Sequence, residues 1–127
     1  MHPEHQILML GVPQESALNE RILSLANVRH ADNVVHELSV AKLIGLSELA
    51  TGLVSVDTGP AHLAAAVGCS VVTLFGTAEP FMYAPRGRKA VVVCLVGERE
   101  GVRSMLYIEP SEVLGAWRQA IVEHATH

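Results

Sequence analysis

The segment from residue 53 to residue 76 constrains the fold most, because two strand-like apolar runs in it flank one helix-like run. The first run, LVSV, ends at the turn-forming residues Asp57, Thr58 and Gly59. A proline then starts a helix that we expect over residues 60–67, and a glycine ends it before the second run, VVTLF. This order predicts a strand, loop, helix and strand unit of the kind that builds parallel sheets.

The turn before this expected helix is typical of an anion-binding site. The backbone N–H groups at a helix start lack partners within the helix, and the helix dipole adds partial positive charge there. Thr58 and Gly59 supply such groups, and His62 falls in the first turn, from which its ring can reach back over the loop. We therefore predict a phosphate or diphosphate site. A structural cap without a ligand is the alternative, since Asp and Thr favour such positions anyway.

The composition indicates a globular α/β protein. The chain has 127 residues, and 50% of them are hydrophobic, which is enough to bury a core. Aromatic residues make up only 4%, whereas Val, Leu and Ala are abundant. That balance is typical of parallel strands that helices cover on both faces.

Apolar periodicity predicts the remaining elements. We expect further strands at residues 7–10, 34–35 and 90–96. We also expect a helix that Ser16 caps, and helices over residues 39–51 and 110–124. Trp117 lies on the apolar stripe of the last helix, so we expect it in the core. The polar stretch at residues 97–104 is expected to be a loop.

Charge and cysteine usage argue against several kinds of partner. The net charge is −4 and the basic residues are scattered apart from one short cluster at residues 86–89, so nucleic acid is not an expected partner. Cys69 and Cys94 have no CxxC spacing, which indicates two core thiols of a reducing compartment and no zinc site. No metal is predicted. The first ten residues resemble neither a signal peptide nor a membrane span, so we expect a cytoplasmic protein.

The run SVDTGPAHLAAA followed by VVTLFGTAEP resembles the C-terminal half of glycosyltransferase family 9, the ADP-heptose:lipopolysaccharide heptosyltransferases. That family carries a D-[ST]-G-x-x-H segment, then a strand, then a loop similar to F-G-P-T-D-P. The matching residues here are Asp57, Thr58, Gly59, His62, Phe75 and Gly76. Weaker similarity extends over nearly the whole chain.

The resemblance implies a Rossmann-like three-layer domain with a mostly parallel sheet, one of the two facing domains of a GT-B glycosyltransferase. Residues 1–127 would form this single domain. It would bind a nucleotide-diphosphate sugar, ADP-heptose or another, for transfer to a lipopolysaccharide-type acceptor at the inner face of the membrane. No separate cofactor is implied. The catalytic general base is expected in an N-terminal acceptor domain that this chain lacks, and the first strand and helix of the donor domain are also expected to be missing.

The same resemblance assigns roles to the residues of the turn. The amides of Thr58 and Gly59 and the ring of His62 would contact the donor diphosphate, while Asp57 would brace the loop. Gly76 would open a second loop at the same site.

Matches outside this segment are looser. Glu37 and Leu38 correspond to the position that flanks the nucleobase, and we include Leu38 among the expected binding residues. Gln14 and Glu15 fall where the family often places an acid that contacts the ribose.

Departures from the family pattern keep a second interpretation open. The loop TAE at residues 77–79 stands where PTD is usual, so a hydroxyl that could help to bind phosphate is missing at Ala78. A truncated, non-catalytic nucleotide-binding or assembly module is therefore the alternative. Because a missing strand would expose a sheet edge, we also expect the chain to form a homodimer.

Overall fold

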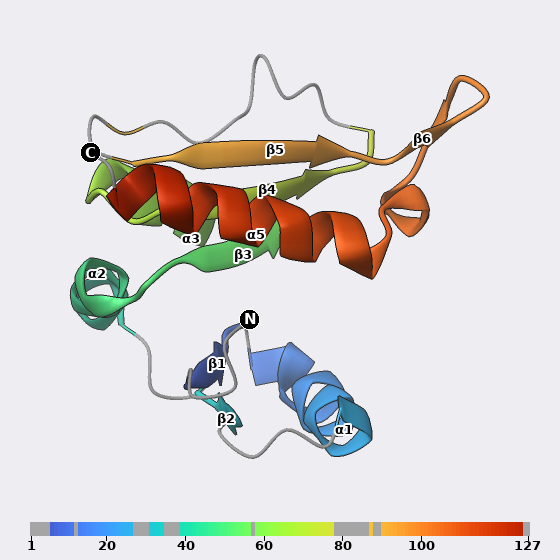
Figure 1. Cartoon of the computed structure of the whole chain (residues 1–127). Helices are drawn as coiled ribbons and strands as arrows, with labels where there is room; N and C mark the ends of the chain where they lie inside the picture. Colours follow the sequence, from blue (N-terminus) through green and yellow to red (C-terminus); the bar gives the residue numbers. More distant parts are fainter. Residues whose placement is uncertain are drawn as a thin grey trace. The chain divides into compact units, whose positions relative to one another are not determined.

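The computed structural model has two compact units, Met1–Ala41 and Lys42–His127. Each unit contains parallel strands and helices (Figure 1). The residues that the structure describes are 6–11, 13–26, 31–34, 39–56, 58–77, 87 and 90–125.

In the first unit, the strands β1 (Ile7–Met9) and β2 (Ala31–Asn33) pair in parallel. Between them in sequence come the 3-10 turn η1 (Pro13–Glu15) and helix α1 (Ser16–Ala26). The expected helix is therefore confirmed, with Ser16 as its first residue and not its N-cap.

The second strand of this unit lies earlier than the apolar residues at 34–35 suggested. The strand contains the polar residues Asp32 and Asn33, whose side chains have hydrogen-bond partners. Asp32 Oδ2 accepts a hydrogen bond of 2.6 Å from Gln6 Nε2. The Asn33 amide donates to Ser16 Oγ and to Glu20 Oε1, each at 3.1 Å. Polar side chains thus hold β2 beside β1 and α1.

The second unit is built on a three-stranded parallel sheet in the order β3, β4 and β5 (Figure 1). Its strands are β3 (Leu53–Val56), β4 (Val71–Phe75) and β5 (Val92–Val96). Helix α3 (Gly59–Ala66) follows β3, and α5 (Pro110–Ala125) lies near the end of the chain. Helix α2 (Val40–Leu49) precedes β3.

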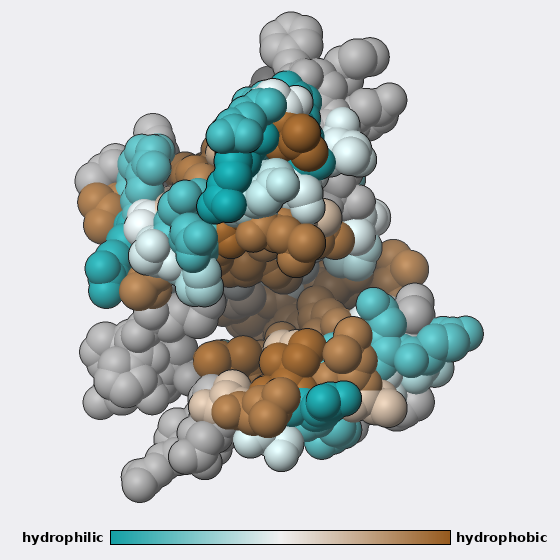
Figure 2. Space-filling model, turned by 90° about the vertical axis from the view of Figure 1, so that its right-hand side faces the viewer, coloured by the Kyte–Doolittle hydropathy of each residue, from teal (hydrophilic) through white to brown (hydrophobic). Residues whose placement is uncertain are grey.

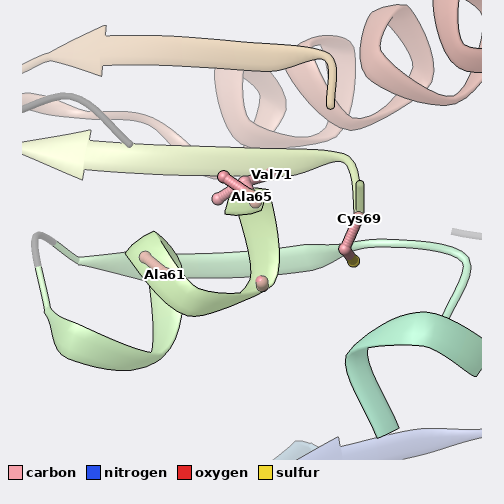
Figure 3. Packing of buried hydrophobic residues seen from close by; sticks show 5 residues of the cluster. Ala61, Ala65, Cys69 and Val71 are labelled. Atoms are coloured by element: carbon pink, nitrogen blue, oxygen red, sulfur yellow. The ribbon is translucent and has the colours of Figure 1, made fainter. Parts of the chain in front are cut away.

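Successive residues of the central strand β4 pack against different helices, which gives the unit three layers. Val71 packs with Ala61 and Ala65 of α3 (Figure 3). Val72 instead packs with Trp117 of α5. Because neighbouring side chains of a strand point to opposite faces, α3 and α5 cover opposite faces of the sheet. The expected α/β three-layer arrangement with a parallel sheet and the core position of Trp117 are confirmed.

Helix α3 begins and ends as its sequence predicts, to within one residue. Its three buried alanines, at positions 61, 64 and 65, form a narrow face that allows close approach to the sheet. Gly68 has a φ of 93° after the last turn. The Gly68 N–H bonds to Ala65 O and the Cys69 N–H to Ala64 O, each at 3.0 Å, which is the Schellman pattern. The next strand can therefore start at once.

The stretch at residues 97–104, expected to be a loop, contains a hairpin. Its strands are β6 (Glu98–Arg99) and β7 (Val102–Arg103), and the 3-10 turn η2 (Met105–Tyr107) follows. The two residues between the strands, Glu100 and Gly101, have φ values of 52° and 81°. Two positive φ values match a type I′ turn, whose usual Asn-Gly or Asp-Gly signal is absent here.

The two cysteines are expected to react slowly in the folded chain. Cys69 is 4% exposed and Cys94 lies half-buried in β5. Burial raises the pKa of both thiols, so less of the reactive thiolate exists at any given pH near neutrality. We expect iodoacetamide labelling at pH 7.5, followed by mass spectrometry, to be much slower in buffer than in urea. Equal rates under the two conditions would contradict the packing of Cys69 beneath α3.

Candidate functional site

The turn between β3 and α3 leaves the sheet at the carboxyl end of its strands. β3 ends at Val56, and α3 begins at Gly59 with Thr58 as its N-cap residue. The first helical hydrogen bond runs from the His62 N–H to the Thr58 carbonyl oxygen, at 3.3 Å. Amides that precede this bond occupy the positive end of the helix dipole. The structure thus brings Thr58, Gly59 and His62 together at one helix start.

The surface over Gly59 is open. Gly59 is exposed, and a Cβ atom built there would meet no atom within 4 Å. Its φ also lies outside the left-handed region, so the fold itself does not require glycine at this position. The missing side chain nevertheless allows a ligand to approach the Gly59 backbone closely. His62, one turn into the helix, is exposed as well.

The Thr58 side chain does not cap α3, at least among the residues that the structure describes. Its hydroxyl lies 3.1 Å from Ser55 Oγ and 3.4 Å from the carbonyl oxygen of Val56. Ser55 was not among the residues expected at the site. The sequence could have indicated Ser55, because it is a polar residue two positions after Leu53. It therefore lies on the face of β3 that packs against the buried residues of α3.

Gly76 directly follows β4 and leaves the same edge of the sheet as the β3–α3 turn, because Leu74 pairs with Val56 in the parallel register. It is buried, and a Cβ there would come within 3.1 Å of the Met105 backbone nitrogen. A hydrogen bond of 3.0 Å from the Gly97 N–H to the Phe75 carbonyl closes the same corner. Close packing therefore accounts for the glycine, and its contact with a donor stays a prediction.

The other expected site residues lie outside the described residues or in the first unit. Asp57, Glu37 and Leu38 lie outside the described residues, as does the loop at residues 78–86. Gln14 and Glu15 are exposed on η1, in the first unit.

The carboxyl edge of the sheet also carries apolar surface. Figure 2 looks onto this face and shows exposed hydrophobic side chains next to hydrophilic ones. A recess of about 420 Å³ there is lined by Leu74, Met105, Ile108, Pro110 and Val113. Another recess, of about 370 Å³, includes Thr51 and Cys69, which precede β3 and β4, and so lies at the opposite edge. Ligands of open α/β sheets bind beyond the carboxyl ends of the strands, which favours the first edge.

Within the described residues, no group of three or more His, Cys, Asp or Glu side chains is arranged to hold a metal ion. The helices of this same part of the chain are all too short or too polar to cross a membrane.

Comparisons with solved structures identify the fold. Escherichia coli ADP-heptose lps heptosyltransferase II is 24% identical and superposes with a TM-score of 0.79, over 95% of this chain and 38% of that protein. A family 9 glycosyltransferase from Veillonella parvula is 18% identical, with a TM-score of 0.77 over 94% of this chain and 37% of that protein. E. coli heptosyltransferase WaaC with ADP is 23% identical, with a TM-score of 0.66 over 94% of this chain and 34% of that protein. The chain thus spans less than two fifths of each relative.

The sequence itself identifies the family. None of the curated proteins is significantly similar to the chain. The family model for glycosyltransferase family 9 (heptosyltransferase), however, matches residues 2–105, a range that includes the β3–α3 turn and Gly76. Because this match covers most of the 127 residues, the chain belongs to glycosyltransferase family 9.

Proposed function

We propose that the chain is the donor-binding part of a heptosyltransferase-like glycosyltransferase. The observation that carries this proposal is the open β3–α3 turn of a family 9 chain, where Thr58, Gly59 and His62 gather at a helix start. The ligand would be a nucleotide-diphosphate sugar, ADP-heptose or another. A similar solved structure, heptosyltransferase WaaC, carries ADP, which supports a nucleotide diphosphate as the ligand. The acceptor would be of the lipopolysaccharide type, at the cytoplasmic face of the membrane.

The chemistry of the turn suits a departing diphosphate. In a direct displacement at the anomeric carbon, negative charge grows on the leaving diphosphate, and oriented N–H groups stabilise such charge. Gly59 offers its backbone without a shielding side chain, and the His62 imidazole can add a donor. Each contact at an exposed helix end contributes only about 0.3–1 kcal/mol, so several must act together. The displacement also needs a general base, a role that we assign to no residue of this chain.

Calorimetric titration of the purified chain with ADP, UDP and an ADP-sugar tests this proposal. We expect saturable binding of at least one of them, and His62→Ala should weaken it about fivefold, the loss of one charge-assisted contact at an exposed site. The matched control is Arg118→Ala, which removes an exposed basic side chain from α5 on the other face of the sheet. Circular dichroism should show that both variants keep the fold.

The outcomes distinguish a nucleotide site at the β3–α3 turn from an assembly module that binds no nucleotide. Binding that His62→Ala weakens and Arg118→Ala leaves unchanged would support a donor site at the β3–α3 turn. A folded wild-type chain that binds none of the three ligands would instead favour the assembly module.

A further inference from the structure

Three hydroxyl side chains lie close to the β3–α3 turn. Ser55 Oγ and Thr58 Oγ1 are 3.1 Å apart, and the Ser55 hydroxyl donates a hydrogen bond of 2.8 Å to the carbonyl oxygen of Val56. Thr73 of β4 is the direct neighbour of Ser55 in the parallel register. Both side chains are on the face that α3 covers, because they alternate with the residues of the α5 face.

Ser55 therefore has two hydroxyl groups as possible partners, and the structure pairs it with Thr58. The Thr58 backbone is extended, with φ −140° and ψ 166°, as is usual for an N-cap residue. A threonine at this position usually turns its hydroxyl to the helix amides, but here the hydroxyl faces Ser55 and Val56 instead. The Thr58 side chain is thus turned toward β3 and away from the helix amides.

A buried hydroxyl next to this pair has no partner in the part of the chain that the structure describes. Thr73 is 0% exposed, and its Oγ1 atom has no hydrogen-bond partner among the described residues. Native chains rarely keep such a group, because removing a hydroxyl from water without a partner is unfavourable. A hydrogen bond between Ser55 and Thr73 would remove this cost. Instead, the Ser55 hydroxyl bonds at the turn and Thr73 is left without a partner within the described ranges, which points to a use of Ser55 at the turn.

We propose that Ser55 is a positioning residue: its hydroxyl holds Thr58, and with it the Thr58–Gly59 turn, in the conformation that receives the diphosphate, while Thr73 competes for the same hydroxyl. The part of this proposal that concerns the ligand rests on the proposed donor site. The competition between Thr58 and Thr73 is a property of the ligand-free chain, and it can be measured without any ligand.

Titration with ADP tests the positioning role. Ser55→Ala removes the hydroxyl that holds Thr58, and we expect ADP to bind about fivefold more weakly. Thr73→Val removes the competing hydroxyl while keeping the shape of the side chain, so we expect ADP to bind about threefold more tightly. In the double variant, Thr73→Val should have no further effect on ADP affinity, because the Ser55 hydroxyl for which Thr73 competes is absent. Ser55→Thr, which keeps a hydroxyl in a β-branched side chain, should bind ADP as the wild type does.

A purely structural role for these residues would give a different pattern. Unchanged affinity in Ser55→Ala would overturn the positioning role. Tightening by Thr73→Val that persists in the double variant would overturn the competition, since the two sites would then act independently.

A measurement without ligand separates failure of this proposal from failure of the donor site. Scalar couplings of the Thr58 side chain, measured by NMR, report its χ1 rotamer. We expect one dominant rotamer in the wild type, averaging in Ser55→Ala, and a still more uniform value in Thr73→Val. If no variant binds ADP but the couplings follow this order, the donor site fails and Ser55 keeps its role in shaping the turn. Identical couplings in all variants would overturn the inference whether or not ADP binds.

Discussion

Replacing Trp117 by alanine is expected to destabilise the second unit by about 3–5 kcal/mol, as deletion of a large buried aromatic side chain usually does. Trp117 is 8% exposed and packs with Val72 of the central strand and with Ala120 of its own helix. Its ring also lies over Gly52, where a Cβ would come within 2.8 Å of the Trp117 ring. The substitution would therefore leave a cavity between α5 and the sheet.

Urea denaturation followed by circular dichroism measures this change. Trp117 is the only tryptophan of the chain, so its fluorescence cannot report on the variant. The matched control is Leu106→Ala, which truncates a large apolar side chain that is 89% exposed, and we expect it to change the free energy of unfolding by less than about 0.5 kcal/mol. A Trp117→Ala variant as stable as the Leu106→Ala control would show that α5 is not anchored to β4.

The central unit of the fold could be predicted from sequence because its local signals agree with its packing. The proline at the start of α3, the buried alanines at helical spacing and Gly68 after the last turn all specify the same helix. The apolar runs on either side are the strands β3 and β4. No long-range information was needed to find this unit, since every signal lies within about twenty-five residues.

The elements that the sequence did not reveal depend on partners or on unusual backbone conformations. The strand β2 contains Asp32 and Asn33, which satisfy their polar groups through Gln6 and Ser16, far away in sequence. The β6–β7 hairpin turns through Glu100 at a positive φ, which non-glycine residues seldom adopt. Neither β2 nor the hairpin shows the hydrophobic periodicity by which an element can be identified from sequence alone.

Some residues of the candidate site could likewise be predicted from sequence, and others could not. Thr58, Gly59 and His62 come together because they follow one another at one helix start. The role of Ser55 depends on which of two hydroxyls it pairs with, and Thr73 becomes its neighbour only when the sheet forms. The binding roles of Asp57 and Leu38 stay predictions.

Gly59→Ala should weaken ADP binding tenfold or more while leaving the stability of the chain unchanged or slightly higher. The added methyl group meets no protein atom within 4 Å, and the φ of Gly59 suits an L-residue, so the fold should accept it. Alanine also favours a helix by up to about 1 kcal/mol relative to glycine. If the diphosphate rests against the Gly59 backbone, however, the methyl group occupies the space of a phosphate oxygen, and the charge-assisted hydrogen bond to the amide is lengthened.

Weaker ADP binding without a loss of stability would distinguish a ligand site from a purely structural helix start. The matched control is Gly115→Ala, which adds a methyl group at an exposed position of α5 where it likewise meets nothing within 4 Å. Calorimetric titration with ADP should find the control unchanged, and thermal denaturation should find neither variant less stable than the wild type. If Gly59→Ala binds ADP as tightly as Gly115→Ala does, the diphosphate does not contact this backbone. The glycine at the start of α3 would then serve neither the fold nor the ligand, and the donor site would have to lie elsewhere on the sheet edge.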